Sequence, residues 1–197
     1  LNLLLILDKS YIFAKILKKL DIKLPIKIGI TGPESTGKTW LAEQLATYFK
    51  TDYTPEYARE YLLKLNRPYS YDDVIEIAKN QWEMINKQQT NNSKVLIYDT
   101  EMLVIYVWLI YKYKKCPQWI IDAFHNQSID LYLLCYPDIE WNYDPLRENP
   151  DDRIELFNIY ENELIKAKKN YIIVTQQLEQ RFANVLNYLK NNYPYIF

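Results

Sequence analysis

Glycine placement constrains the fold of this chain more strongly than any other feature of its sequence. The 197 residues include only 3 glycines, Gly29, Gly32 and Gly37, and all of them fall within nine consecutive positions. Glycine reaches backbone conformations that are closed to other residues and lets a main chain come close to a ligand. The cluster therefore predicts a turn in which the backbone itself makes the functional contact.

The residues around this cluster fit a phosphate-binding pattern. The segment GPESTGKT, from Gly32 to Thr39, follows the apolar run 26–30, which predicts a strand. Inward-turned N–H groups and the positive end of the next helix favour an anion there. Lys38 is expected to reach the β- and γ-phosphates of ATP, and the Thr39 hydroxyl to bind the bridging Mg²⁺. The expected nucleotide-binding residues are Gly32, Pro33, Glu34, Ser35, Thr36, Gly37, Lys38, Thr39 and Trp40. The alternative is a glycine-bearing turn that binds nothing.

Apolar runs and helical patterns alternate along the rest of the chain. Strands are predicted at 26–30, 94–101, 130–138 and 171–175, with a weaker one at 51–55. Helices are predicted at 38–49, 55–65, 72–89 and 102–113, with two more flanking the last strand; for 102–113, which is apolar nearly all round, a strand is the alternative. This order predicts an α/β fold with a mainly parallel sheet flanked by helices. Ligands of such sheets bind beyond the carboxyl ends of the strands.

Length and composition favour a single domain in a reducing compartment. Residues 25–197 are expected to form one phosphate-loop domain, and residues 1–24 an extension that folds as an amphipathic helix packed on it, with membrane-surface binding as the alternative. The apolar run in the extension is too short to span a bilayer. A net charge of -1 gives no basic excess for nucleic acid. Cys116 and Cys135 are far apart, which favours neither a disulfide framework nor a zinc site and indicates a cytoplasmic location.

Two further segments carry charged residues suited to phosphate chemistry. Asp99 ends the apolar strand 94–101, where an acid is the usual second ligand of Mg²⁺ in phosphate-loop enzymes; the alternative is a solvated acid at a strand exit. Arg147 and Arg153 lie in the polar segment 141–153. Arginines on a mobile lid close over the transferring phosphoryl group in small-molecule kinases. A surface loop with ordinary salt bridges is equally compatible with this segment.

The sequence resembles the nicotinamide riboside kinases, a family related to the kinase half of bifunctional NAD-biosynthesis regulators. The matching segments run in order from about residue 25 to the C-terminus, at 32–39, 55–60, 99–101, 130–134, 137–141 and 144–147. The resemblance implies a nucleoside/nucleotide-kinase-like fold with a lid, and ATP-dependent phosphorylation of the 5′-hydroxyl of nicotinamide riboside to nicotinamide mononucleotide. The chain departs from the family at Pro145 and at 175–177, where relatives carry glycine, and at Pro55, where relatives can carry an aromatic residue.

The implied reaction assigns roles to the remaining candidates. The acceptor hydroxyl needs a carboxylate within hydrogen-bond reach, and we expect Glu56 to serve the substrate and Asp99 the metal. Arg59 either contacts phosphate or pairs with Glu60 or Glu56. A pyridinium cation is attracted by an aromatic face, for which Tyr57, Trp82, Trp108 and Trp141 are candidates. The expected catalytic residues are Lys38, Glu56, Asp99, Arg147 and Arg153, and the expected substrate-binding residues are Glu56, Tyr57, Arg59, Trp82, Asp99 and Trp141.

Two other functions are compatible with the same motifs. One is a kinase for a different nucleoside or small metabolite, because its phosphate and magnesium parts would be identical. The other is a regulatory or interaction module in which the phosphate loop acts as a switch. The sequence predicts neither the oligomeric state nor the choice between ATP and GTP.

Overall fold

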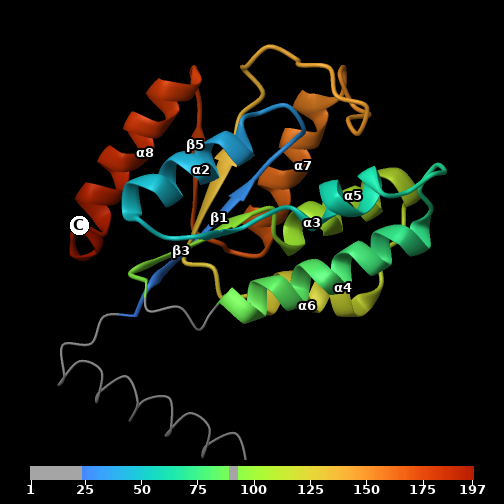
Figure 1. Cartoon of the computed structure of the whole chain (residues 1–197), viewed down its shortest axis with the longest axis horizontal. Helices are drawn as coiled ribbons and strands as arrows, with labels where there is room; N and C mark the ends of the chain where they lie inside the picture. Colours follow the sequence, from blue (N-terminus) through green and yellow to red (C-terminus); the bar gives the residue numbers. More distant parts are fainter. Residues whose placement is uncertain (1–23, 89–92) are drawn as a thin grey trace, which may run out of the picture.

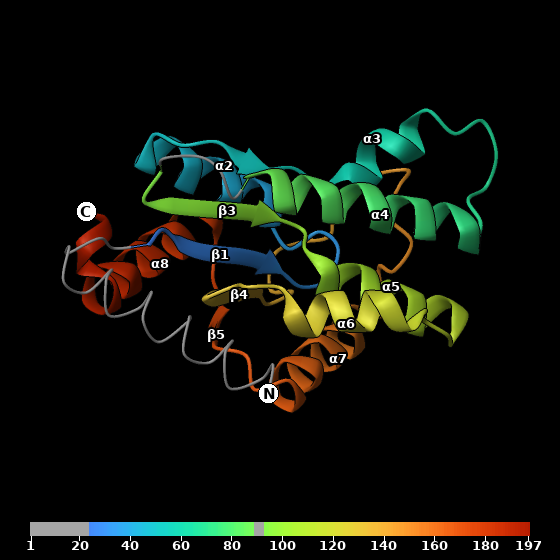
Figure 2. The same cartoon turned by 90° about the horizontal axis from the view of Figure 1, so that it is seen from below.

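The computed structural model describes residues 24–88 and 93–197, within which five strands form one sheet (Figures 1 and 2). The strands are β1 (Ile26–Thr31), β2 (Tyr53–Thr54), β3 (Val95–Asp99), β4 (Leu131–Cys135) and β5 (Tyr171–Val174), in the spatial order β2-β3-β1-β4-β5. All pairings are parallel, with Ile30 opposite Asp99 and Thr31 opposite Leu134. The strand order reverses at β1, so the loops leaving the central strands diverge there, as in other ligand-binding sheets of this type.

Helices cover both faces of the sheet. On one face lie α2 (Lys38–Phe49) and α8 (Leu178–Asn192), and on the other lie α4 (Tyr71–Gln88), α5 (Met102–Tyr113), α6 (Gln118–Asn126) and α7 (Arg153–Lys166). The short α3 (Tyr57–Leu63) packs beside α4, and a 3-10 turn, Pro194–Ile196, closes the chain. Figure 1 separates the two layers clearly, with α2 and α8 on one side of the strands. The described residues therefore form a three-layer α/β arrangement.

The alternation of apolar side chains along the strands explains the two layers. Ile26, Ile28 and Ile30 of β1 are almost fully buried on the α2 and α8 face, whereas Leu96 and Tyr98 of β3 are buried on the opposite face. Each fully buried apolar side chain stabilises the fold by about 1.5–3 kcal/mol. The sheet centre is thus held on both faces, and the loops at the strand ends are supported by a rigid base.

The structure confirms the predicted fold class and most predicted elements, with a few corrections. The helix expected at 55–65 begins at Tyr57, because Pro55 precedes the extended capping residue Glu56. The nine-residue helix α6 follows Pro117 and was not among the predicted elements. The expected helix of the extension falls almost entirely outside the described residues. Among the residues that the structure describes, none of the helices has the length and apolar character needed to cross a membrane.

Candidate active site

The loop between β1 and α2 explains why two of the glycines lie where they do. Gly32 has φ +126°, and a Cβ there would stand 2.7 Å from the backbone oxygen of Cys135. Gly37 has φ +74°, and a Cβ there would stand 2.6 Å from a methyl carbon of Leu178. Both positions combine a left-handed backbone with a close neighbour, so a side chain at either one would distort the loop. The loop also holds Ser35 at φ +53°.

The first residues of α2 bring the loop's charged and hydroxyl groups together. Gly37 is the amino-terminal cap of α2, so the positive end of the helix faces the loop. The Lys38 ammonium donates a hydrogen bond to the Pro33 carbonyl at 2.7 Å, and the Thr36 hydroxyl donates to the same oxygen at 2.9 Å. Lys38 therefore lies across the mouth of the loop, where an anion bound by the loop N–H groups would meet its charge.

Asp99 and Thr39 form a pair that suits a magnesium ion. Asp99 is 1% exposed, whereas Thr39 is exposed and lies close enough to Asp99 to affect its pKa. Burial raises the pKa of Asp99 to about 6, the nearby Thr39 hydroxyl opposes the increase, and repulsion from Glu56 adds to it. The Oδ1 oxygen of Asp99 is buried and has no hydrogen-bond partner in the described part of the chain.

The residues present fit a magnesium ion that is bound together with a nucleotide. The described residues contain no group of three or more histidine, cysteine or acidic side chains that could hold a metal. Mg²⁺ commonly takes only one or two protein oxygens and completes its shell with phosphate oxygens and water. The Thr39 hydroxyl and the unpartnered oxygen of Asp99 are ligands of that kind.

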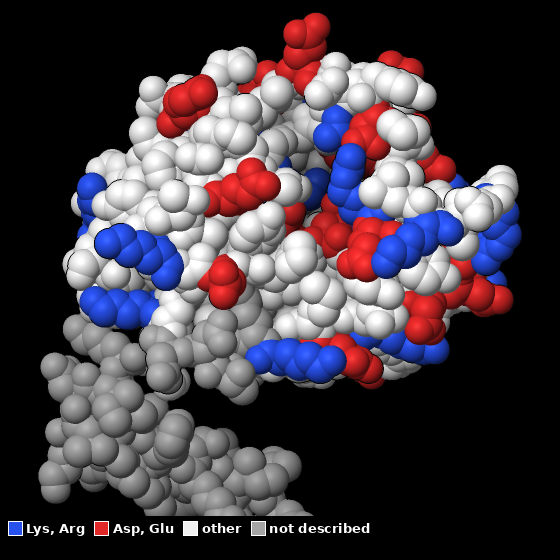
Figure 3. Space-filling model, in the orientation of Figure 1, with Lys and Arg blue, Asp and Glu red and all other residues white. Residues whose placement is uncertain are grey.

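A cleft of about 590 Å³ opens beside the phosphate loop. Figure 3 views this face of the molecule and shows a hollow with both acidic and basic side chains around it. The predicted residues that line the cleft are Gly32, Pro33, Glu34, Ser35, Thr36, Gly37, Lys38, Thr39, Trp40, Glu56, Arg59, Trp108 and Arg147. Asp99 is not one of the lining residues, but Lys38, Thr39 and Glu56 all lie close enough to it to affect its pKa.

Part of the cleft lining is aromatic. The rings of Tyr69 and Trp108 meet edge to face with their centroids 5.1 Å apart, and the Trp108 indole N–H donates to the Tyr69 hydroxyl at 3.1 Å. Lys112 lies 4.0 Å from the centroid of the Tyr69 ring and bonds both oxygens of Glu148. Tyr111 and Tyr160 line the cleft as well. This wall offers flat apolar surface bordered by one acid and one base.

Sequence reasoning missed most of this wall, although part of its signal was present. Val104, Trp108 and Lys112 recur every four residues along α5, which places them on one helix face, and Leu156 and Tyr160 do the same along α7. Once Trp108 was a candidate, its helical neighbours could have been inferred. Tyr69 lies in an irregular segment, where no periodicity could have indicated it.

The segment between β4 and α7 contacts the phosphate loop directly. In Figure 1 it is the orange loop at the same end of the sheet as the blue phosphate loop. The Glu34 carboxylate accepts hydrogen bonds from the backbone N–H groups of Glu148, at 2.9 Å, and Asn149, at 3.2 Å. The Ser35 hydroxyl accepts one from the Asn142 N–H at 3.0 Å. Burial nevertheless raises the pKa of Glu34, because these hydrogen bonds offset only part of its desolvation.

The two arginines of this segment occupy different positions. Arg147 lines the cleft and donates to the Asn142 carbonyl at 2.5 Å, with a longer contact of 3.4 Å to the Ser35 hydroxyl. Arg153 is outside the cleft lining and donates to the carbonyls of Ile139, at 2.8 Å, and Ser35, at 3.3 Å. Arg147 thus faces the cleft, whereas Arg153 ties the segment to the loop.

Several predicted substrate residues lie away from the cleft lining. Tyr57 uses its N–H to bond Gln81 and packs its ring near Tyr61, and Trp82 packs against the core. Trp141 lies beside Arg153, whose guanidinium is 5.6 Å from the centroid of its ring. Because these rings lie outside the cleft lining and Trp108 is part of it, we assign the aromatic wall to the residues around Trp108 instead.

Arg59 has a partner that the sequence analysis did not name. Its guanidinium pairs with Asp144 at 2.7 Å, and not with Glu60, whose carboxylate pairs with Lys64. A hydrogen bond from the Leu146 N–H and the contact with Arg59 both hold the pKa of Asp144 below its ordinary value. Arg59 and Asp144 line the cleft, so this pair bridges α3 and the β4–α7 segment across it.

Arg181 was also missed, and it is the largest fully buried side chain of the described residues. Its guanidinium bonds Asp138 and donates to the carbonyls of Thr36, Tyr136 and Gln176. It therefore joins the phosphate loop to the loops after β4 and β5. Gln176, in the 175–177 stretch where relatives carry glycine, has φ +79°, so the glycine-like backbone is kept without the glycine.

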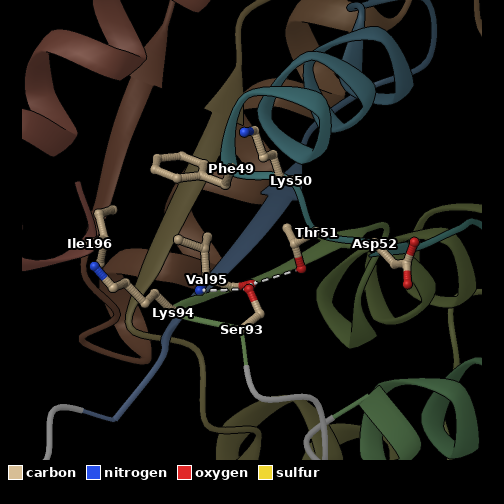
Figure 4. A pocket seen from close by; sticks show the side chains of 8 residues that line it. All are labelled: Phe49, Lys50, Thr51, Asp52, Ser93, Lys94, Val95 and Ile196. Carbon is tan, nitrogen blue, oxygen red and sulfur yellow. Dashed lines mark hydrogen bonds between the residues drawn. The ribbon is translucent and has the colours of Figure 1, made fainter.

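A second hollow, of about 460 Å³, lies near the amino end of β3 (Figure 4). It is lined by Phe49, Lys50, Thr51, Asp52, Ser93, Lys94, Val95 and Ile196. Its hydrogen bonds join Thr51 and Ser93 to the backbone of Val95. Because Val95 and Asp99 are opposite ends of one strand, this hollow is separate from the phosphate loop, and we assign it no catalytic role.

The fold and the loop geometry together define a P-loop nucleotide-binding domain with the topology of the nucleoside and nucleotide kinases. A family model described as AAA domain matches residues 27–181, which is most of the chain. The chain therefore belongs to that AAA domain family.

Solved structures with this fold include two NadR proteins. One, in complex with NR, has a TM-score of 0.75 and 19% sequence identity, and the match covers 85% of this chain and 51% of that one. The other, in complex with NAD and AMP-PNP, has a TM-score of 0.70 and 20% identity, and the match covers 85% of this chain and 49% of that one. The match thus spans about half the length of the NadR structures. The resemblance of this chain to a NadR-like kinase domain is confirmed at the level of the fold.

Shorter kinases match along their whole length. A deoxyadenosine kinase from M. mycoides has a TM-score of 0.59 and 14% identity, and the match covers 84% of this chain and 100% of the enzyme. A thymidylate kinase from Ehrlichia chaffeensis has a TM-score of 0.58 and 14% identity, with 85% and 100% covered. The nucleoside/nucleotide-kinase-like fold predicted from the sequence is confirmed by these matches.

Proposed function

We propose that this protein uses ATP to phosphorylate the 5′-hydroxyl of nicotinamide riboside, giving nicotinamide mononucleotide. The observation that carries the proposal is a single cleft that is lined by the phosphate loop, by Glu56 and by several aromatic side chains. The similarity to a NadR protein in complex with NR supports the choice of nicotinamide riboside. A volume of about 590 Å³ lies within the usual range of small-molecule sites.

Phosphoryl transfer requires positioning and charge neutralisation more than covalent help from the protein. In our proposal the N–H groups of residues 34–39 hold the β- and γ-phosphates, and Lys38 neutralises their charge. Thr39 and Asp99 hold Mg²⁺, which when bound offsets the negative charge of the phosphate oxygens. Arg147 faces the same space from the β4–α7 segment and closes over the transferred group, and Arg153 holds that segment against the loop.

The acceptor hydroxyl needs a base on the side of the γ-phosphate away from the leaving group. Glu56 lines the cleft near Asp99, and Asp99 is buried next to Thr39. We assign Glu56 to orienting the 5′-hydroxyl and accepting its proton, and Asp99 to the metal. Arg59, held by Asp144, borders the same space and keeps positive charge near the phosphates.

The aromatic part of the cleft suits the base of the proposed acceptor. Nicotinamide riboside carries a pyridinium cation, which is attracted to the face of an aromatic ring. Trp108 and Tyr69 form an edge-to-face pair there, and Lys112 already covers the Tyr69 ring and pairs with Glu148. We therefore assign the pyridinium ring to Trp108.

We expect nicotinamide riboside to be the preferred acceptor. With Mg²⁺-ATP, its kcat/KM should exceed that of uridine, cytidine or deoxynucleosides by at least about tenfold, since a site that pairs the polar groups of its substrate rejects analogues strongly. Product formation measured by chromatography checks the ranking. A reversed ranking would indicate a kinase for another nucleoside. Tight nucleotide binding without turnover on any acceptor would indicate a regulatory module in which the phosphate loop acts as a switch.

Two tryptophan variants test where the base binds. Trp108→Leu removes a cleft ring and should raise the KM for the acceptor while the KM for ATP stays close to the wild-type value. Trp82→Leu removes a partly buried ring outside the cleft lining and is the matched control. A larger acceptor effect for Trp82→Leu than for Trp108→Leu would contradict the placement of the base.

A further inference from the structure

Gln81 is a fully buried polar residue whose side chain bonds only backbone. It lies in α4 and is 0% exposed. Its Oε1 accepts the Tyr57 N–H at 2.8 Å, and its Nε2 donates to the carbonyls of Pro55 and Thr100, each at 3.1 Å. A buried amide with both ends bonded is costly to disturb, because each lost bond leaves a buried backbone group unpaired.

The three bonds join the segments that carry the two carboxylates of the site. Pro55 and Tyr57 are the neighbours of Glu56 on either side, and Thr100 directly follows Asp99. The β2–β3 ladder pairs Thr54 with Tyr98 and goes no further along β2. Gln81 therefore continues the connection between these two segments beyond the point where the sheet ends.

The Gln81 bonds matter because they hold backbone that few other contacts restrain. Thr100 has φ +72°, a left-handed conformation that costs a non-glycine residue free energy, and its own N–H makes only a long bond of 3.3 Å to the Ile30 carbonyl. The carbonyls of Pro55 and Thr100 and the N–H of Tyr57 each bond the Gln81 side chain, so its loss would leave all three backbone groups without this partner.

We propose that Gln81 is a positioning residue that fixes Glu56 relative to Asp99 by bonding the backbone on both sides of Glu56 and the backbone next to Asp99. It touches neither substrate nor nucleotide in this role. The effect of Gln81 on catalysis rests on the proposed function. The structural part, the restraint of the Glu56 segment, does not depend on which acceptor is used.

The kinetic test uses Gln81→Met, which keeps the volume and removes all three bonds. We expect kcat to fall about 10- to 100-fold, as misplacement of a reacting group by about 1 Å does, with the KM for ATP within about twofold of the wild type. The fall should be largely absent when Glu56→Gln is already present, because two residues that act through one group are not additive. Independent, additive effects would overturn the inference.

A control variant separates positioning from general destabilisation. Ile85→Ala truncates a core residue one turn further along α4 and makes no change to the backbone at residues 55–57 or 100. It should lower the melting temperature while kcat stays within about twofold of the wild type. If Gln81→Met does not fold, Gln81→Glu keeps the acceptor of the Tyr57 N–H and loses the amide donor, and the same comparison with Glu56→Gln applies to it.

Amide hydrogen exchange tests the restraint without any turnover. The Tyr57 N–H is the first of α3, and the first N–H groups of a helix have no acceptor within it. Gln81→Met should therefore raise exchange at Tyr57 at least about tenfold relative to the middle of β3, whereas Ile85→Ala should not. Unchanged exchange at Tyr57 would overturn the inference even in an inactive protein, and a wild type inactive on every acceptor would overturn only the proposed function.

Discussion

Replacing Lys38 by alanine is expected to lower kcat by at least about a hundredfold, because it removes a charge that is placed where negative charge develops in the transition state. Lys38 is the first residue of α2 and reaches over the phosphate loop to the Pro33 carbonyl. It is only partly buried, so the free energy of unfolding should stay within about 0.5 kcal/mol of the wild type. Initial rates and a denaturant melt of the same preparation measure both quantities.

The matched control is Lys79→Ala. Lys79 is an exposed residue of α4 whose only described ion pair, with Glu76, is on the surface. This variant changes the net charge by the same amount and should leave both kcat and stability near the wild-type values. Near-normal turnover in Lys38→Ala would contradict the assignment of residues 32–39 to the phosphates.

Replacing Asp99 by asparagine should change activity and stability in opposite directions. The variant keeps the shape of the side chain but removes the charge proposed to hold Mg²⁺, so kcat should fall at least about a hundredfold, consistent with the several kcal/mol that a catalytic metal supplies. At neutral pH and above, the metal-free variant should be more stable than the metal-free wild type, because it no longer keeps a charged carboxylate buried.

The sign of the pH dependence follows from the raised pKa of Asp99, about 6 against an ordinary value of 3.8. The native state holds this proton more tightly than the unfolded state, so the wild type loses stability as pH rises between these two values and stays at the lower level above them. The free energy of unfolding of Asp99→Asn, relative to that of the wild type, should therefore increase by roughly 2–3 kcal/mol between pH 4 and pH 7.

The measurement is a series of denaturant melts in a chelator, with Asp122→Asn as the control. Asp122 is an exposed residue of α6 that accepts a hydrogen bond from Gln118. Its variant should track the wild type at every pH. Parallel stability curves for Asp99→Asn and the wild type would show that Asp99 does not titrate in this range in the folded protein.

The fold was readable from the sequence where one physical rule acted alone. Buried parallel strands read as continuous apolar runs, so 94–101 and 130–138 correctly located β3 and β4. The phosphate loop followed from Gly32 and Gly37, whose positive φ angles and close neighbours favour glycine. The helix α6 was not predicted because it is short: its nine residues, which follow Pro117, show little more than two turns of helical periodicity.

The cleft was only partly readable because it is built by contacts between distant segments. Trp108 could be named as an aromatic candidate, but Trp82 and Trp141 fitted the same criterion and lie elsewhere. Tertiary packing chose among them, and no local pattern reports that choice. Gln81 and Arg181 were invisible for a related reason, since polar residues are expected at the surface and both are fully buried by bonds to backbone far along the chain.

The most direct test of the account is a crystal structure with Mg²⁺, a non-hydrolysable ATP analogue and nicotinamide riboside. We predict the β- and γ-phosphates against the N–H groups of residues 34–39, the metal on Thr39 and Asp99, and the acceptor's 5′-hydroxyl within hydrogen-bond reach of Glu56. A nucleotide bound elsewhere, with the loop filled by its own side chains, would contradict the account.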